Sequence, residues 1–193
     1  KAIKKWIALG FAVTAAVLLL LFLPDTPKSQ YFHHQGNIFG TYYNIRYEAT
    51  TDLHAAIQDQ LHTFDHSLSM FNPSSVISRI NRNEPIIVDT LFEQMYTQAH
   101  AISQLSHGAF DITVRPLVNA WGFGTKSQEP GIRNQDIDID SIKAFVGYDK
   151  IALLDHRLSK SDPRITLDAS AIAKGYACDV VADLLRTHGC QNL

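Results

Sequence analysis

The first 23 residues place the strongest constraint on how the rest of the chain can fold. Three lysines in the segment KAIKK precede an uncharged run, WIALGFAVTAAVLLLLFL, over residues 6–23. A run of this length is just long enough to span a bilayer, and the lysines predict a cytoplasmic N-terminus. We therefore expect an uncleaved signal anchor over residues 1–23, with everything from Pro24 onward exported.

Two other interpretations of this segment stay open. A cleaved secretory signal has the same charged and apolar regions, although no small-x-small cleavage motif follows Leu23. A buried core helix is the second alternative. The polar residues 24–35 carry two prolines and are predicted to form a tether. The tether would lead into a domain over residues 36–193.

Charge and cysteine content exclude several classes of protein. The formal net charge is −2, and lysine and arginine are scattered after the N-terminus, so no basic block suits nucleic acid. Cys178 and Cys190 are far apart and form no C-x-x-C motif. We expect two buried free thiols, with a disulfide as the alternative in an oxidising compartment.

Helical and strand periodicities mix along the domain. Alternation of Tyr43, Ile45 and Tyr47 predicts a half-buried strand over residues 41–48. Apolar residues at helical spacing predict a helix over residues 53–68, capped by Thr51 or Asp52. A capping box at Thr90 opens a helix that runs to Leu105, with Leu91, Met95, Ala99 and Ile102 on the same apolar face. The other predicted elements are a turn at 76–80, strands at 86–88, 150–154 and 165–167, a polar loop at 125–138, a short helix at 141–145, and a last helix from Ser170 to His188.

This mixture, with strands often adjacent in sequence, predicts an α+β fold around a largely antiparallel sheet. The chain stops soon after the last predicted helix. A sheet built from these strands would be incomplete, so we expect these residues to be the N-terminal portion of a longer protein.

Several common catalytic motifs do not occur in the sequence. There is no H-E-x-x-H, no G-x-S-x-G and no G-x-x-x-x-G-K-[ST]. Asp136, Asp138 and Asp140 alternate with isoleucine, which fits a solvated face better than a calcium site. Residues 108–124 are rich in glycine and aromatic side chains, and composition alone predicts a buried, irregular connection.

The segment RITLDASAIAKGY, residues 164–176, carries the most chemistry. A β-branched run leads to Asp168, and Ser170 could cap the helix that follows. The free N–H groups of a first helical turn favour an anion. Small alanines allow close approach of a ligand, and Lys174 adds a positive charge able to meet a phosphate. The alternatives are a phosphate site and an ordinary capped helix with Lys174 in solvent.

Four segments together resemble the ApbE-type flavin transferase family, the FAD:protein FMN transferases. They are FGTY at residues 39–42, residues 69–81 ending in ISRIN, the run GAFDITVRPLVNAWGFG at 108–124, and LDASAIAKGYA at 167–177 followed by Asp179. Their order and spacing match over roughly residues 36–190. The exported, membrane-anchored habit of that family also suits the N-terminal segment, and implies a bacterial inner-membrane protein with its domain on the periplasmic side.

The resemblance implies an enzyme that binds FAD and Mg²⁺ and transfers FMN to a threonine or serine hydroxyl of a partner protein, releasing AMP. The implied partner is an acceptor protein of a membrane electron-transport complex. Two alternatives stay open: a membrane-tethered flavin-binding or assembly protein without turnover, and an FAD pyrophosphatase that gives FMN and AMP.

The resemblance also assigns site residues position by position. Asp168 and Lys174 would contact FAD, and the backbone carbonyl of Ala171 would bind the metal. Phe39 stands where the family usually has methionine, and Phe71 where it usually has tyrosine. Both keep an apolar wall, but Phe71 lacks a hydroxyl that could donate a hydrogen bond. The remaining residues that would line the FAD site are Ala109, Phe110 and Asp111.

Two expectations follow from these assignments. A carbonyl of Ala171 that binds metal cannot accept the usual helical hydrogen bond, so regular helix should begin after Ser170 or with an irregular first turn. The other metal carboxylates and the catalytic histidine of the family belong to a C-terminal half beyond Leu193. Residues 1–193 alone are therefore not expected to catalyse transfer, and the catalytic base stays unassigned.

Overall fold

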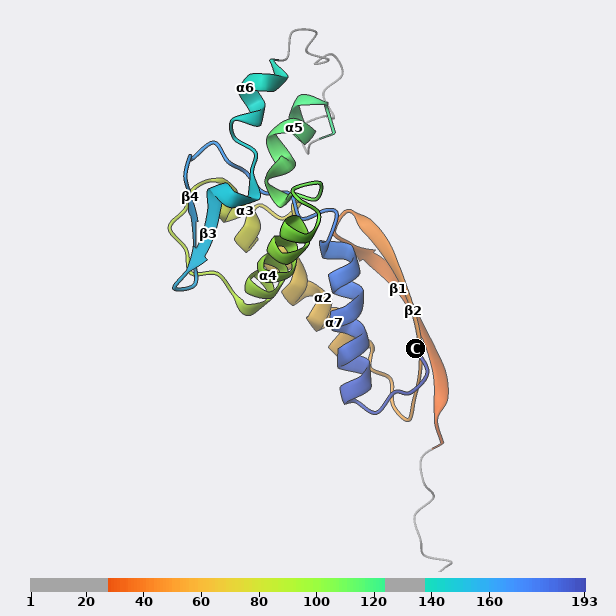
Figure 1. Cartoon of the computed structure of the whole chain (residues 1–193). Helices are drawn as coiled ribbons and strands as arrows, with labels where there is room; N and C mark the ends of the chain where they lie inside the picture. Colours follow the sequence, from red (N-terminus) through yellow and green to blue (C-terminus); the bar gives the residue numbers. More distant parts are fainter. Residues whose placement is uncertain (1–27, 124–137) are drawn as a thin grey trace, which may run out of the picture.

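The computed structural model describes residues 28–123 and 138–193. Within these ranges the chain forms two antiparallel hairpins and six α-helices (Figure 1). The same ranges hold no helix long and apolar enough to cross a membrane. The predicted anchor at residues 1–23 and nearly all of the predicted loop at 125–138 lie outside them. The α+β prediction agrees with this architecture, but the described strands form two separate small sheets instead of one larger sheet.

The first hairpin joins β1 (Gln30–Ile38) to β2 (Thr41–Ala49) in antiparallel register. Its two-residue turn, Phe39-Gly40, has φ of 54° and 68°, and two consecutive positive φ values are what type I′ hairpin turns require. The alternation predicted for β2 is confirmed. The tether prediction is wrong at its end, because residues 30–35 belong to β1.

The two long helices predicted in the first half of the domain are confirmed, with corrections at their starts. Helix α2 (His54–Leu68) begins after Leu53, and Asp52 accepts a hydrogen bond from the His54 N–H at 2.9 Å. Helix α4 (Thr90–Leu105) is capped by Asp89 instead of Thr90. Its inward face is also shifted, because Leu105 is 82% exposed. The buried residues of α4 are Phe92, Met95, Tyr96, Ala99 and Ser103.

The remaining elements are short except for the last helix. The stretch 108–124, expected to be irregular, contains a 3-10 turn and a short helix. Asp138 caps the following helix through the Ser141 N–H, and Asp140 pairs with Lys143, so both have structural partners. In chain order, the elements other than β1, β2, α2 and α4 are α3 (Val76–Asn81), η1 (Ile112–Val114), α5 (Arg115–Ala120), α6 (Ile139–Lys143), η2 (Tyr148–Lys150), β3 (Ile151–Leu154), β4 (Arg157–Lys160) and α7 (Ala173–Thr187).

Two predicted strands, at residues 86–88 and 165–167, are wrong, and one strand was missed. β3 pairs with β4 across a turn at Asp155-His156, where φ is 48° and 57°. Residues 165–167 have no regular secondary structure and pair with no strand of the described part of the chain. Side chains hold their backbone instead: the Asn81 amide pairs with Leu167 and the Lys160 ammonium donates to the Ile165 carbonyl. Apolar, β-branched content predicted a strand here but not these hydrogen-bond partners.

The buried side chains form two clusters that meet along α2. The larger cluster lies between α2, α3, α4, the segment 165–169 and the start of α7. The smaller cluster packs the hairpin β1–β2 against α2 and α7 through Tyr47, Ile57, Leu61, Val181 and Leu185. In Figure 1 the hairpin runs alongside α7 for most of its length. This packing brings the hairpin turn to the N-terminal end of α7.

Tyr47 ties the hairpin to α2, and its loss should be measurable. Its fully buried side chain donates to Asp52 at 2.8 Å and accepts from the Leu53 N–H at 2.7 Å. We expect Tyr47→Phe to lower the free energy of unfolding by about 1–3 kcal/mol, because the Leu53 N–H loses its partner. Urea unfolding measures this, with Tyr42→Phe, at a 79% exposed position of the same strand, as the control.

The same residue predicts a pH dependence. Burial raises the pKa of Tyr47 to about 12, above the ordinary value of 10.0. The neutral phenol is favoured in the folded state, so its contribution is complete below pH 10.0 and is lost as pH rises towards 12. The parent should therefore lose more stability over that interval than Tyr47→Phe. Equal losses in the two proteins would contradict the assignment.

Candidate functional site

The segment that leads into α7 has the irregular start expected for Ala171. Helix α7 begins at Ala173 with Ile172 as its N-cap, so the predicted start and cap at Ser170 are wrong. The Ala169 carbonyl accepts from the N–H groups of both Ile172 and Ala173, at 3.0 and 2.8 Å. The expectation that regular helix begins after Ser170 is confirmed.

This start leaves three backbone groups available at the surface. Within the described part of the chain, no hydrogen bond ends on the Ala171 carbonyl or begins at the N–H of Lys174 or Gly175. All three residues are exposed, and a Cβ built on Gly175 meets nothing within 4 Å. Unpaired N–H groups at a helix N-terminus, beside a lysine ammonium, suit a phosphate.

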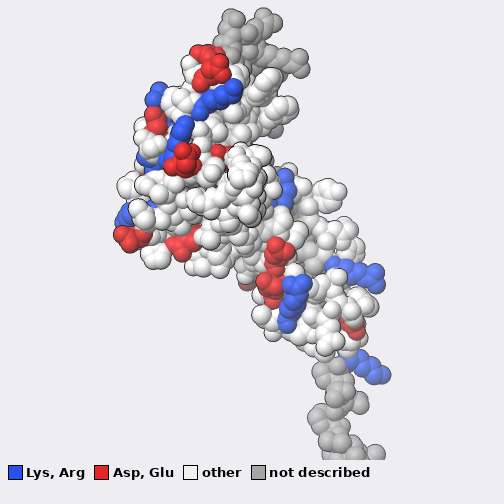
Figure 2. Space-filling model, viewed as in Figure 1, with Lys and Arg blue, Asp and Glu red and all other residues white. Residues whose placement is uncertain are grey.

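Charge on the molecule as a whole does not supply that attraction. The net charge is −2, and Figure 2 shows acidic and basic side chains interspersed on the face that it draws. Attraction of an anion must therefore come from local groups such as Lys174 and the N–H groups beside it, because dispersed charges of both signs cancel at a distance.

Asp168 lies at the centre of the candidate site. Its N–H donates to the Ile112 carbonyl at 2.7 Å, which joins the segment to η1. Its Oδ1 accepts from the Ser170 N–H at 2.8 Å, and the side chain is half-buried. Burial lowers the pKa of Arg115, and the negative charge of Asp168 opposes that shift. The two side chains therefore lie near each other. The carboxylate thus lies within electrostatic reach of a cation and is still partly open to solvent.

Asp111 is held by the protein through both carboxylate oxygens. Oδ1 accepts from the N–H and the hydroxyl of Thr113, each at 2.7 Å, and Oδ2 accepts from the Tyr148 N–H at 2.8 Å. Asp111 therefore fixes η1 against residues 147–148. Beside it, Ala109 is exposed and Phe110 packs partly against the larger cluster. Their predicted contacts with FAD stay predictions.

Phe39 and Phe71 meet at the hairpin turn. Phe39 is a bulky residue at positive φ, an uncommon conformation that tends to occur where the surroundings enforce it. Its ring centroid lies 5.2 Å from that of Phe64. The ring of Phe71 covers Gly40, where a Cβ atom would lie 3.1 Å from the ring, and Phe71 is 62% exposed. An exposed aromatic ring thus borders the turn.

These contacts bring four separate segments to one region. Phe64 contacts both Phe39 and Tyr176 of α7, the latter at a centroid distance of 5.4 Å. Arg115 donates to the Met70 sulfur at 3.5 Å, next to Phe71 in sequence. In Figure 1 the hairpin turn, the start of α5 and the start of α7 lie close together. Phe39, Phe71, Asp168 and Lys174 therefore lie around the N-terminal end of α7, whereas Asp111 binds Thr113 and Tyr148.

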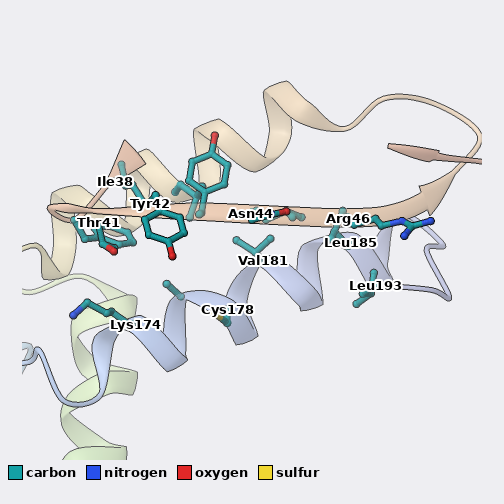
Figure 3. A pocket seen from close by; sticks show the side chains of 15 residues that line it. Ile38, Thr41, Tyr42, Asn44, Arg46, Lys174, Cys178, Val181, Leu185 and Leu193 are labelled. Carbon is teal, nitrogen blue, oxygen red and sulfur yellow. The ribbon is translucent and has the colours of Figure 1, made fainter. Parts of the chain in front are cut away.

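A groove of about 460 Å³ runs between β2 and α7 (Figure 3). It is lined mainly by apolar side chains, and Lys174 and Phe39 stand among its residues. Figure 3 shows Lys174 near the Thr41 end of β2, with Cys178 one turn further along α7. Cys178 is exposed, contrary to prediction, while Cys190 is a buried free thiol as predicted. The volume lies in the range of small-molecule sites.

The described residues offer groups suited to a phosphate but do not form a complete magnesium site. Mg²⁺ prefers several oxygen ligands, and the segment offers the Ala171 carbonyl. No group of three or more His, Cys, Asp or Glu residues able to hold a metal occurs within residues 28–123 and 138–193. The Lys174 ammonium and the N–H groups at the start of α7 carry charge opposite to that of a pyrophosphate.

Two residues at the site were not predicted from the sequence. Arg115 follows η1 in a run where no basic residue was singled out. Asn81 closes the ISRIN segment, which entered the resemblance without a role for its asparagine. An asparagine at a helix end is common, so only its contacts with a distant segment could reveal what it holds.

Known proteins resemble this chain over most of its length. The ApbE family model matches residues 39–193. A FAD:protein FMN transferase of Vibrio cholerae is 34% identical over 192 residues, which cover 95% of this chain and 57% of that protein. The corresponding protein of Escherichia coli K12 is 30% identical over 196 residues, covering 92% and 56%. The chain spans about half the length of these relatives.

Solved structures give the same result. The flavin transferase ApbE from Vibrio cholerae superposes with a TM-score of 0.78 at 33% identity, over 86% of this chain and 56% of that one. The apo flavinyl transferase ApbE of Pseudomonas stutzeri gives a TM-score of 0.74 at 30% identity, over 84% and 54%. With the family model matched over residues 39–193, the chain belongs to the ApbE family.

Proposed function

We propose that this chain is the FAD-binding portion of an FAD:protein FMN transferase. The observation that carries the proposal is the start of α7, where the Lys174 ammonium and the free N–H groups of Lys174 and Gly175 follow shortly after Asp168 in the chain. These groups would hold the pyrophosphate of FAD. The Asp168 carboxylate would accept a hydrogen bond from the nucleotide, and Phe39 and Phe71 would border it.

The proposed reaction is a phosphoryl transfer in which one bond to phosphorus forms and one breaks. The oxygen of an acceptor threonine or serine hydroxyl forms a bond to the phosphorus of the FMN half. The bond from that phosphorus to the bridging oxygen breaks, AMP leaves, and the hydroxyl proton goes to a base. Catalysis of this kind depends on positioning and charge. Bound Mg²⁺ would neutralise pyrophosphate charge, and the Ala171 carbonyl is the ligand that this chain would contribute.

The proposed partner is an acceptor protein of a membrane electron-transport complex, at the extracytoplasmic side of a bacterial inner membrane. The support for this placement is the sequence of the first 23 residues, in which three lysines precede an uncharged run. Flavinylation would then occur after export of both proteins.

One assay tests the proposal. The whole protein, at its natural length, is incubated with FAD, Mg²⁺ and a peptide that carries the acceptor threonine. We expect peptide-bound FMN together with AMP, and no flavin on a matched peptide with alanine in place of the threonine. Free FMN plus AMP would show an FAD pyrophosphatase, and unchanged bound FAD would show a flavin-binding protein without turnover. Either result overturns the transfer proposal.

A further inference from the structure

The backbone just before Asp168 is held by one side chain from a distant part of the sequence. Oδ1 of Asn81 accepts from the Leu167 N–H at 2.7 Å, and its Nδ2 donates to the Leu167 carbonyl at 2.9 Å. Asn81 is the last residue of α3, 86 positions earlier in the chain. A single carboxamide thus takes the place that a neighbouring strand would have at this residue.

Only a carboxamide of this length meets both groups of one residue. The Asn81 side chain presents an acceptor and a donor side by side, as a peptide group does. Leu167 is fully buried, so a backbone group that lost its partner there would have little access to water. The next residue is Asp168, whose N–H is fixed to Ile112 at 2.7 Å. Its position therefore depends on bonds from α3 and from η1.

The bonds that fix Leu167 and Asp168 also affect the position of the start of α7. Asp168 accepts from the Ser170 N–H. The turn so formed leads to the Ala171 carbonyl and to the N–H groups of Lys174 and Gly175, which have no partner among the described residues. We propose that Asn81 is a positioning residue for the flavin nucleotide, because its amide clamp on Leu167 sets where Asp168 and this turn lie. The inference rests on the proposed function, since the ligand it positions for is FAD.

Asn83 offers a matched control. It lies two residues further along, and its Nδ2 donates to the Pro163 carbonyl of the same segment at 3.0 Å. It is exposed, and its partner Pro163 lies five residues before Asp168, whereas the partner of Asn81 is the residue next to Asp168. Because Asn83 has a φ of 60°, Asn83→Gly removes the amide without adding left-handed strain. Removing the Asn81 amide breaks two bonds to this segment and removing the Asn83 amide breaks one, and only the Asn81 bonds adjoin Asp168.

The experiment measures FAD affinity and steady-state kinetics in the whole protein. We expect Asn81→Ala to raise the Kd and the KM for FAD by about tenfold or more. This is the effect of losing one charge-assisted hydrogen bond, here the bond between the displaced Asp168 carboxylate and FAD. The kcat per folded molecule should change much less. Asn83→Gly should leave both constants within about twofold of the parent, as substitutions remote from a site do. A merely structural role would reduce the folded fraction and leave the KM unchanged.

A second variant keeps the test independent of folding losses. Asn81→Asp retains an acceptor for the Leu167 N–H, but its ionised form sets a carboxylate against the Leu167 carbonyl. Its protonated form again offers a donor and an acceptor. Its FAD affinity, relative to the parent at each pH, should therefore recover as pH falls. Unchanged FAD affinity in both Asn81 variants, with normal binding by the parent, would overturn the inference. Absence of FAD binding by the parent would instead overturn the proposed function.

Discussion

Asp168→Ala should weaken FAD binding by about tenfold to a hundredfold. The expected size is that of a hydrogen bond to a charged group, about 1.5–3 kcal/mol, where each 1.4 kcal/mol corresponds to about tenfold in affinity. The carboxylate is half-buried, near Arg115, and one residue beyond the clamped Leu167. Isothermal titration of FAD into the parent and the variant measures the change.

Asp168→Asn separates contact with the ligand from support of the turn. The amide oxygen can still accept from the Ser170 N–H, which the carboxylate does at 2.8 Å, but the negative charge is gone. We expect this variant to lose most of the same affinity while its thermal unfolding stays close to that of the parent. If Asp168→Asn binds FAD as the parent does, the charge has no direct role and the assignment of Asp168 as an FAD contact fails.

Phe64→Ala should give the largest loss of stability among these predictions, about 3–5 kcal/mol. The ring is 1% exposed and contacts Phe39 on one side and Tyr176 on the other. Its removal leaves a cavity where α2, the hairpin turn and α7 meet. Urea unfolding with linear extrapolation measures the loss. FAD affinity should fall as well, because the turn and the start of α7 both pack against this ring.

Phe71→Ala is the matched control for that loss. It is the same chemical change, in a ring that is 62% exposed, so it should cost well under half as much stability. Phe64→Leu, which refills much of the space, should lie between the two in stability. A loss in Phe64→Ala no greater than in Phe71→Ala would contradict the central packing role of Phe64.

Sequence periodicity predicted the elements whose stability comes from one buried face. β2, α2 and α4 were found because Tyr47, Phe64 and Met95 recur at strand or helix spacing with their neighbours. The start of α4 was off by a residue because Asp89 and Thr90 can each serve as a cap. The predicted cap of α2 at Thr51 or Asp52 was wrong, because Leu53 is the N-cap and makes no side-chain cap bond. β4 was missed because Leu158 is the only apolar residue of Arg157–Lys160, although Asp155-His156 is a workable turn.

The predicted strand at residues 165–167 shows where the sequence signal stops. Its β-branched and apolar residues describe an extended, buried backbone, and Ile165 and Leu167 are indeed fully buried. Whether such a backbone pairs with a strand or with side chains depends on what lies opposite. Here the partners are Asn81 and Lys160, and nothing local to residues 165–167 encodes them.

The sequence by itself determined the α+β class, the presence of the long helices and the resemblance to the ApbE family. Those features depend on local spacing and on short ordered motifs. Only the tertiary structure decided that Asn81 clamps Leu167, that both oxygens of Asp111 bind groups of the protein, and that Arg115 stands near Asp168. The physical reason is that a polar side chain finds its partner across the fold, where sequence distance carries no information about contact.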